Sequence, residues 1–416
     1  MTRDDFDALI VGSSIAGSAV ATMLGRAGLQ VALVESRPDI DTFKRPCGHF
    51  LQASATPVLQ RLGVTDEIER DGGIRNSVAI WSKRGWVHPN NPHSAQGSQH
   101  GYTLRREKLD PLLRRRAAQT PGVELMLGTS VTSVVDDPDT LVKLTVSDTS
   151  GHTRRLRGRL LVAADGRNST IGKLAGVRAQ PLLNRRFMYM AYYERLPLAF
   201  GGTGQLWFCE PDMFYAYPTD DDLTLLACSI TKTRLAAFKR DRETNFQRCF
   251  KPLSLGPQPE AGKRVTPFIG KLDMTNYRRA PTHGRIAFVG DCALAPDPSW
   301  AVGCGWALRS AEWLADSVNG SVGDRREVEA GLARYRRLHQ SELLPAFLMI
   351  ASYSVARPML PPERLLMRGA ARDPVLAETL HGFGAGTFPA WKLFAPRTLA
   401  RAAWTSVFHP LPRESI

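Results

Sequence analysis

The stretch DALIVGSSIAGSAVATMLGRAGLQVALVES, residues 7–36, constrains the fold of this chain more than any other part. Residues 8–11 form a short apolar run, which predicts a buried parallel strand. Residues 15–27 carry small and apolar side chains at helical spacing, and a second apolar run at 31–34 ends in Glu35. This order of strand, glycine turn, helix, strand and acid predicts a βαβ unit that binds a dinucleotide; a purely structural βαβ unit is the alternative.

The residues at the turn have separate predicted tasks. Gly12 allows the chain to turn tightly out of the strand, and Gly17 allows the helix to approach the sheet closely. Ser14 stands where the motif G-x-G-x-x-G has its middle glycine, and its hydroxyl can donate to a phosphate oxygen. The helix N-terminus attracts a pyrophosphate, and Glu35 accepts hydrogen bonds from an adenosine ribose. The predicted nucleotide contacts of this unit are Gly12, Ser14, Ile15, Ala16, Gly17, Glu35 and Ser36.

The composition is that of a globular protein with a strong positive charge. The chain has 416 residues, 43% hydrophobic and 23% charged, and is long enough for two closely joined lobes. Its formal net charge is +14, and the segment 105–116 is dense in arginine, which we interpret as an amphipathic helix with a solvated face. No nucleic-acid recognition motif accompanies this charge. The partners it would attract are an acidic substrate, an acidic carrier protein or an anionic surface.

The cysteines and the N-terminus predict a cytoplasmic location. Six cysteines are present without C-x-x-C spacing, which is typical of a reducing compartment. The N-terminal residues include Asp4, Asp5 and Asp7, which is unlike a signal peptide, and no apolar stretch is long enough to predict a membrane span. The sequence does not indicate an oligomeric state.

Downstream, the pattern changes twice. Between about 180 and 264 the apolar runs are typical of an antiparallel sheet, and an apolar run at 285–289 then predicts a return to the parallel sheet. The remainder is predicted to be helical, with proline breaks. The predicted domains are a nucleotide-binding domain (1–75, 100–178 and 265–325), a substrate domain (76–99 and 179–264) and a helical C-terminal region (326–416).

Two further motifs follow the βαβ unit in order: LLVAADGRNSTIGKLAGV at 160–177 and GRIAFVGDCALAPDPSWAVGCGWALRSAEWLAD at 284–316. Together the three motifs resemble the FAD-dependent monooxygenases of the aromatic-hydroxylase superfamily, and the pattern is most similar to the branch of geranylgeranyl reductases and flavin halogenases. The resemblance implies an α/β fold: a Rossmann-like FAD-binding domain of glutathione-reductase-type topology, an α+β second lobe built on an antiparallel sheet, and the helical C-terminal region. It implies FAD as the cofactor.

The resemblance also implies roles for single residues. Asp291 would hydrogen-bond the ribityl chain, and Arg106 in R-E-K-L-D would meet the pyrophosphate side. Asp165 would lie near the cofactor; the family's arginine seven residues later is Gly172 here, and the first glycine of the family motif P-x-x-G-x-G is Ala301. The further cofactor contacts implied are Cys47, Gly48, Arg106, Val131, Asp165, Gly166, Gly290, Asp291, Pro298, Gly303, Cys304 and Gly305.

No acid–base residue follows from the sequence. The tetrad Pro46-Cys47-Gly48-His49 either forms a plain turn before a helix or lies over the cofactor with Cys47 and His49 facing a substrate. Tyr215 and Trp300 are further candidates for the pocket, and each of these four side chains has a structural alternative.

The function expected from the resemblance is hydroxylation or epoxidation of a hydrophobic small molecule in specialised metabolism, through a C4a-hydroperoxyflavin. Phe214, Tyr215 and Tyr217 in the second lobe are predicted to wall the substrate pocket. Because there is no second glycine-rich βαβ unit, NAD(P)H would bind transiently or a partner flavin reductase would supply electrons.

Two alternatives to oxygen insertion remain at this point. One is a double-bond reductase of geranylgeranyl reductase type, and the other is a cyclase or binding protein with a structural FAD. Halogenation is disfavoured, because the halogenase signature W-x-W-x-I-P is MFYAYP at 213–218 and the available lysine, Lys83, is predicted to be a turn residue.

Overall fold

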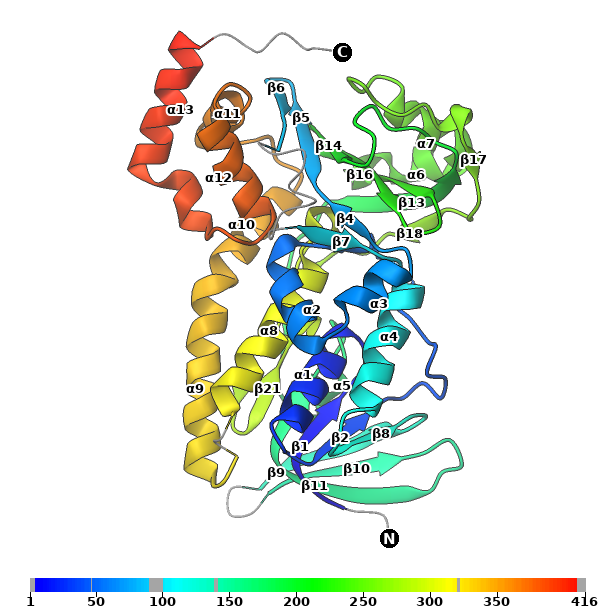
Figure 1. Cartoon of the computed structure of the whole chain (residues 1–416), viewed down its shortest axis with the longest axis vertical. Coiled ribbons are helices and arrows are strands. Elements are labelled where there is room, and N and C mark those ends of the chain that lie inside the picture. Colours follow the sequence, from blue (N-terminus) through cyan, green and yellow to red (C-terminus); the bar gives the residue numbers. More distant parts are fainter. Residues whose placement is uncertain (1–3, 46, 90–99, 138–140, 320–321, 410–416) are drawn as a thin grey trace.

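The computed structural model describes residues 4–45, 47–89, 100–137, 141–319 and 322–409. Pro46 of the predicted loop and residues 90–99 of the predicted substrate domain lie outside these described residues. Figure 1 shows one large sheet with its helices in the lower half, a second sheet in the upper half, and a layer of C-terminal helices beside it.

The lower sheet is built around β1 (Asp5–Val11), whose residues Ala8, Leu9 and Ile10 are fully buried. The strand order is β20-β21-β11-β1-β2-β8, with β10 and β9 added beside β11. β1 pairs in parallel with β2 and β11, and β11 pairs in parallel with β21. The bounds are β2 (Val31–Val34), β8 (Val123–Met126), β9 (Ser130–Asp136), β10 (Val142–Ser147), β11 (Thr153–Ala163), β20 (Thr282–His283) and β21 (Ile286–Phe288). The predicted Rossmann-like α/β fold is confirmed.

Helices from distant parts of the sequence cover one face of this sheet. α1 packs against α8 and α4, and α8 packs against α9. They share one hydrophobic cluster with β1, β2 and β11, in which Leu24, Leu109, Leu314 and Tyr335 are buried. The bounds are α1 (Ile15–Arg26), α2 (Thr56–Leu62), α3 (Thr65–Arg70), α4 (Arg106–Ala118), α5 (Thr170–Leu174), α8 (Gly303–Val318) and α9 (Arg325–Glu342).

The upper sheet has the order β17-β13-β16-β15-β14-β5-β6, with β18 beside β13. The antiparallel sheet predicted between about 180 and 264 is found, with β13, β16, β15 and β14 paired in antiparallel. β5, which comes from the first hundred residues, pairs with β14 in parallel. The bounds are β5 (Val78–Ser82), β6 (Gly85–Val87), β13 (Arg186–Glu194), β14 (Gly204–Cys209), β15 (Asp212–Thr219), β16 (Leu223–Thr231), β17 (Lys263–Arg264) and β18 (Ile269–Lys271). α6 (Leu235–Arg240) and α7 (Arg242–Phe250) share a hydrophobic cluster with one face.

Two three-stranded sheets accompany the large ones. The first is β3 (Phe50–Leu51), β7 (Gly101–Thr103) and β4 (Ile74–Asn76), and β4 and β7 lie between the two large sheets in Figure 1. The second is β12 (Gln180–Leu182), β19 (Asn276–Arg278) and β22 (Leu294–Ala295). Both connect segments that are far apart in the sequence.

The C-terminal region is helical, as predicted, and its prolines lie at or between helix starts, so they separate successive helices. Pro345, Pro361 and Pro374 lie in the first turn of α10, α11 and α12. A backbone N–H in the first turn has no hydrogen-bond partner within the helix, so proline, which lacks this N–H, is tolerated there. The bounds are α10 (Leu344–Ser354), α11 (Pro361–Ala370), α12 (Pro374–Gly384), the 3₁₀ helix η7 (Ala390–Phe394) and α13 (Pro396–Phe408). These helices share a hydrophobic cluster with the second face of the upper sheet.

Gly17 provides a test of how closely α1 approaches the first turn. A Cβ at Gly17 would lie 1.7 Å from the Gly12 carbonyl oxygen, a backbone atom that cannot move away without deforming the turn. We expect Gly17→Ala to lower the free energy of unfolding by at least about 3 kcal/mol in urea titrations. Gly384→Ala is the matched control, because nothing lies within 4 Å of a Cβ there. Equal stability of the two variants would contradict the close approach.

Candidate active site

A cavity of about 500 Å³ lies at the carboxyl ends of the central parallel strands of the lower sheet. Val11, Val34, Ala164 and Val289, which end or directly follow β1, β2, β11 and β21, all line it. Ligands of open α/β sheets bind at this edge. The structure brings together here Gly12, Ser14, Ile15, Ala16, Glu35, Ser36, Cys47, Gly48, Arg106, Val131, Asp165, Gly166, Gly290, Asp291, Pro298, Gly303 and Cys304. Of the predicted cofactor contacts, only Gly17 and Gly305 do not line it.

Gly17 and Gly305 lie behind this cavity. Gly17 is packed against the backbone of Gly12, and a Cβ at Gly305 would lie 2.8 Å from Oε1 of Gln52. Both glycines therefore allow close packing around the cavity.

The turn after β1 has the geometry of an anion site. Gly12 has a φ of 99°, and a Cβ there would lie 2.5 Å from the Ala164 carbonyl oxygen, so a glycine is required. No side chain caps the N-terminus of α1. The first-turn N–H groups and the positive end of the helix dipole are therefore free to bind a pyrophosphate.

Glu35 is held in place at the end of β2. Its carboxylate accepts hydrogen bonds from the Ser13 backbone N–H (3.0 Å), the Ser13 hydroxyl (2.9 Å) and the Arg37 backbone N–H (3.0 Å). Burial opposes ionisation, but these donors lower the pKa of Glu35 below its ordinary value. The ionised, oriented carboxylate fits the predicted contact with a ribose hydroxyl.

Arg106 is buried and already has a carboxylate partner. Its guanidinium binds Asp110 through Nε (2.6 Å) and Nη2 (2.9 Å), and Nη2 also donates to the Ser14 hydroxyl at 2.7 Å. Arg114, also buried, donates from Nε to the Ser13 hydroxyl at 2.7 Å. The predicted solvated face of 105–116 is thus wrong for these two arginines. α4 turns them toward the β1–α1 turn, and Arg106 reaches that turn through Ser14.

Asp291 is paired with a lysine that the sequence analysis did not select. Lys44 Nζ lies 2.9 Å from Asp291 Oδ2, and the Lys44 backbone N–H donates to Asp110 at 3.1 Å. Burial opposes ionisation of Asp291, but the charge and hydrogen bond of Lys44, together with the charges of Arg106 and Arg167, lower its pKa below the ordinary value. The segment before the predicted tetrad is therefore tied across the cavity to η5 (Gly290–Cys292) and α4.

Two thiols lie close to the guanidinium of Arg106: Cys47, and Cys304 in the first turn of α8. Cys47 Sγ is 3.8 Å from Cys304 Sγ, and Arg106 Nη1 is 3.7 Å from the former and 3.8 Å from the latter. The hydrogen bond with Cys304 and the charge of Arg106 lower the pKa of the Cys47 thiol well below its ordinary value. Cys47 is therefore the thiol of this pair with thiolate character.

His49 is unsuited to act as a base. Its Nδ1 accepts the backbone N–H of Arg106 at 2.7 Å, which occupies the basic nitrogen and leaves Nε2 protonated. Burial lowers the pKa of the imidazole, so it is neutral near pH 7.

Asp165 lines the cavity, but its carboxylate already accepts hydrogen bonds from the start of the helix that follows it, α5. Its carboxylate accepts from the Ser169 hydroxyl (2.6 Å) and the Ile171 backbone N–H (3.0 Å). At Gly172, where the family has an arginine, a Cβ would lie 2.8 Å from the guanidinium of Arg279. An arginine from another segment thus packs against this turn of α5, and the absence of a side chain at Gly172 makes room for it.

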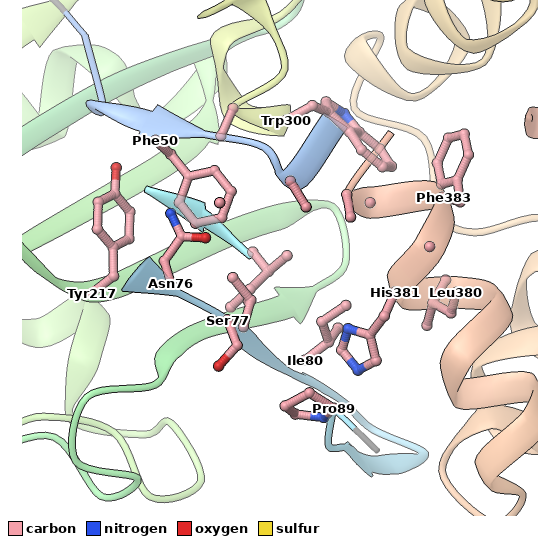
Figure 2. A pocket seen from close by; sticks show the side chains of 18 of the residues that line it. Phe50, Asn76, Ser77, Ile80, Pro89, Tyr217, Trp300, Leu380, His381 and Phe383 are labelled. Atoms are coloured by element: carbon pink, nitrogen blue, oxygen red, sulfur yellow. The ribbon is translucent and has the colours of Figure 1, made fainter. Parts of the chain in front are cut away.

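A second cavity, of about 520 Å³, adjoins the first and is mostly apolar. The two share Phe50 and Ala301 as lining residues. Figure 2 shows Phe50 and Tyr217 on one side, Leu380, His381 and Phe383 of α12 on the other, and Trp300 above, near Phe383. Tyr215 and Trp300 line this second cavity and not the first, whereas Cys47 and His49 line the first.

The predicted aromatic wall is partly wrong. Tyr215 and Tyr217 line the apolar cavity, but Phe214 packs on the opposite face of the sheet, near Phe250. Successive residues of a strand point to opposite faces, so Phe214 and Tyr215 could not both face one cavity, whereas Tyr215 and Tyr217 can.

Several lining residues were missed, and only some left a trace in the sequence. Asp110 and Arg114 follow the predicted contact Arg106 at intervals of four residues, which places all three on one face of a helix and could have indicated a network. Lys44 and the α12 residues lie in segments without a recognisable motif. Other missed residues that line the first cavity are Arg37, Thr129, Ser130, Arg167, Thr170 and Ala307.

Comparisons with known proteins point to FAD as the cofactor. The model of the "FAD binding domain" family matches residues 5–201. The chain is 23% identical to the digeranylgeranylglycerophospholipid reductase of Picrophilus torridus over 80% of this chain and 83% of that protein. It is 27% identical to a 3-(3-hydroxy-phenyl)propionate/3-hydroxycinnamic acid hydroxylase of Comamonas testosteroni over 42% of this chain, which is 30% of that protein. The solved structure of the flavin-dependent brominase Bmp2 has a TM-score of 0.76, with 18% identity and coverage of 96% and 98%.

The fold and the site therefore define an FAD-dependent oxidoreductase. The chain is similar to geranylgeranyl reductases, to aromatic hydroxylases and, in its fold, to a flavin-dependent brominase. The cavity fits this cofactor, since it offers an uncapped helix N-terminus, an ionised carboxylate at the end of β2 and a second carboxylate, Asp291, toward the start of α8.

The thiol of Cys47 provides a test of where FAD binds. We expect iodoacetamide to modify Cys47 of the apoprotein at neutral pH, and saturating FAD to slow this reaction at least about tenfold, because Cys47 lines the cavity and has a lowered pKa. Peptide mass spectrometry measures the rate. Cys209 is the internal control, because burial raises its pKa to about 12 and it lines neither cavity. Modification of Cys47 that is unaffected by FAD would contradict this site.

Proposed function

We propose that this protein is an FAD-dependent monooxygenase that hydroxylates or epoxidises a hydrophobic small molecule. The observation that supports this most is the apolar cavity, which meets the cofactor cavity at Phe50 and Ala301. A substrate in it would be surrounded mainly by side chains such as Ile80, Leu206 and Phe208 and would lie next to the bound cofactor.

The lining of the apolar cavity offers little for proton transfer. Its titratable residues are Tyr215, Tyr217, Glu378 and His381. The Tyr215 hydroxyl donates to the Ser299 carbonyl and the Tyr217 hydroxyl to the Gly48 carbonyl, so both protons are occupied. Burial raises the pKa of both phenols well above the ordinary value.

The two remaining titratable residues, His381 and Glu378, add no group suited to proton transfer. Burial lowers the pKa of His381 to about 4, so its imidazole is neutral near pH 7, and Glu378 is exposed. Oxygen insertion into an apolar molecule requires mainly that the protein positions the substrate and excludes water. This cavity is suited to both.

The cofactor supplies the redox chemistry when it is bound, because reduced FAD activates dioxygen. The residues of the chain would hold the cofactor. The N-terminus of α1 would bind the pyrophosphate, Glu35 the ribose hydroxyls and Asp291 the ribityl hydroxyls. The electrons come from NAD(P)H or from a partner flavin reductase. We place the reaction in specialised metabolism and the protein in the cytoplasm.

Reduction of a carbon–carbon double bond is the second candidate. It is favoured by the alignment with the digeranylgeranylglycerophospholipid reductase, which extends over most of both chains, whereas the hydroxylase alignment covers less than a third of that enzyme. Halogenation has less support from the site. Lys83 is exposed in the turn between β5 and β6 and lines neither cavity, and Lys44 is paired with Asp291.

Labelled dioxygen distinguishes these reactions. We expect the FAD-loaded protein, supplied with NADPH and a flavin reductase, to convert members of a panel of hydrophobic alkenes, from styrene to limonene, into products that carry one ¹⁸O atom from ¹⁸O₂. One oxygen atom enters the product and the other leaves as water, with NADPH as reductant. Mass spectrometry of the extracts measures this. Products two hydrogens heavier and without label would support the reductase, and product formation with 5-deaza-FAD under air would support a structural flavin.

A cavity-filling variant tests the substrate site separately from the cofactor site. Leu206 lines the apolar cavity and not the cofactor cavity. We expect Leu206→Trp to lower kcat/KM for the accepted alkene at least about tenfold by occupying substrate volume, with an unchanged Kd for FAD. Leu183→Trp, an exposed leucine of neither cavity, is the matched control. A loss of FAD affinity in Leu206→Trp, or full activity, would contradict the assignment of the two cavities.

A further inference from the structure

The last helix of the chain exposes its large apolar side chains. On α13 the side chains of Trp404, Val407 and Phe408 are 63%, 74% and 62% exposed, and the two aromatic rings are 4.2 Å apart. The side of α13 that packs on the protein carries the small residues Ala402, Thr405 and Ser406 instead. A helix that only packs against the core buries its large apolar side chains and exposes its small or polar ones. α13 does the reverse, which indicates that its outer face contacts something apolar.

The same surface is rich in arginine, and the carboxylate beside it, Asp373, is buried and paired with Arg401 of α13. Arg397 is exposed at the start of α13, and Arg368 is exposed on the neighbouring α11. Arg372, just after α11, donates from Nε to the His409 carbonyl at 3.1 Å, next to Phe408. Burial and the nearby charge of Arg368 lower the pKa of Arg372, which shows that positive charges are close together here. Between Glu378 and Glu414 the sequence contains no acidic residue.

We infer that this surface, which we call the α13 surface, docks on an anionic lipid membrane. It consists of Arg368 and Arg372 with Arg397, Trp404, Val407 and Phe408. Aromatic and aliphatic side chains enter the interface between headgroups and acyl chains, and the surrounding arginines bind the phosphates of anionic lipids.

The charge of the α13 surface decides between the possible occupants. A second copy of the chain would bring the same arginines opposite each other across a two-fold axis, which opposes self-association. An anionic bilayer matches both features, the apolar ridge and the positive charges around it. α13 lies at the outer edge of the C-terminal helices in Figure 1, where a flat surface can reach it. Among the described residues, no helix combines the length and apolar character needed to cross a bilayer.

The α13 surface is connected to the apolar cavity along the chain. Leu380, His381 and Phe383 of α12 and then Phe388 line that cavity, and the chain continues through η7, with exposed Trp391, into α13. A membrane contact at α13 would therefore place the wall of the cavity close to the bilayer, in which hydrophobic substrates dissolve. The identity of the substrate as a membrane-dissolved molecule rests on the proposed function, whereas the membrane contact itself does not.

Co-sedimentation with lipid vesicles tests this inference without any turnover. We expect the FAD-loaded full-length protein to sediment with vesicles of equal parts phosphatidylcholine and phosphatidylglycerol, and much less with phosphatidylcholine alone. Trp404→Ser combined with Phe408→Ser should weaken binding to the anionic vesicles at least about tenfold. Arg368→Gln combined with Arg397→Gln should weaken it by about fivefold for each arginine removed and reduce the preference for anionic lipid.

Val135→Ser is the matched control, because Val135 is an exposed apolar residue of β9, far from α13 in Figure 1, and this variant should bind as the wild type does. All variants should keep their flavin content and melting temperature, since the changed side chains are exposed. A wild type that stays in the supernatant with both vesicle types, or aromatic variants that bind unchanged, would overturn the inference. So would self-association in the absence of vesicles that the aromatic variants abolish. The oxygen-labelling result is independent of each of these outcomes.

Discussion

The close contact between the start of α1 and the end of β1 is the constraint on which the rest of the structure depends. Gly12 and Gly17 let the helix start directly over the strand end, where a side chain at either position would collide with backbone. This contact brings the uncapped N-terminus of α1 to the carboxyl edge of the sheet. The ends of β2, β11 and β21 then complete one cavity around it. The cofactor site is thus a consequence of how closely one helix packs on one sheet.

Ion pairs hold the segments around this cavity together. Asp110 accepts from Arg106 and from the backbone of Lys44, and Lys44 in turn pairs with Asp291. The pair of Arg106 and Asp110 is buried. Burying charges costs free energy unless each has a partner of opposite charge and good geometry, which this pair has. The chain of contacts from α4 to the segment around Lys44 and on to η5 also positions Cys47 against Cys304. The protein can therefore present a polar cofactor site and keep the neighbouring cavity apolar.

The two cavities meet at Ala301, a residue whose backbone conformation favours glycine. Ala301 has a φ of 51° and is one of the two residues that line both cavities, and the family motif has glycine at this position. A non-glycine residue in this left-handed region costs about 1 kcal/mol or slightly more. The methyl group of Ala301 and the ring of Phe50 stand where the substrate and the cofactor would come closest. Small changes at this junction are expected to affect both sites.

The local pattern determined much of this protein. Strand and helix periodicity, the glycine turn and Glu35 predicted the βαβ unit, and three ordered motifs predicted most of the residues that line the first cavity, because these elements depend on neighbours in the sequence. The buried roles of Arg106 and Arg114, the pairing of Lys44 with Asp291 and the parallel pairing of β5 with β14 depended on the tertiary structure. So did the wall that α12 contributes to the apolar cavity and the outward orientation of Trp404 and Phe408. These features join residues that are up to several hundred positions apart, and sequence spacing carries no information about such contacts.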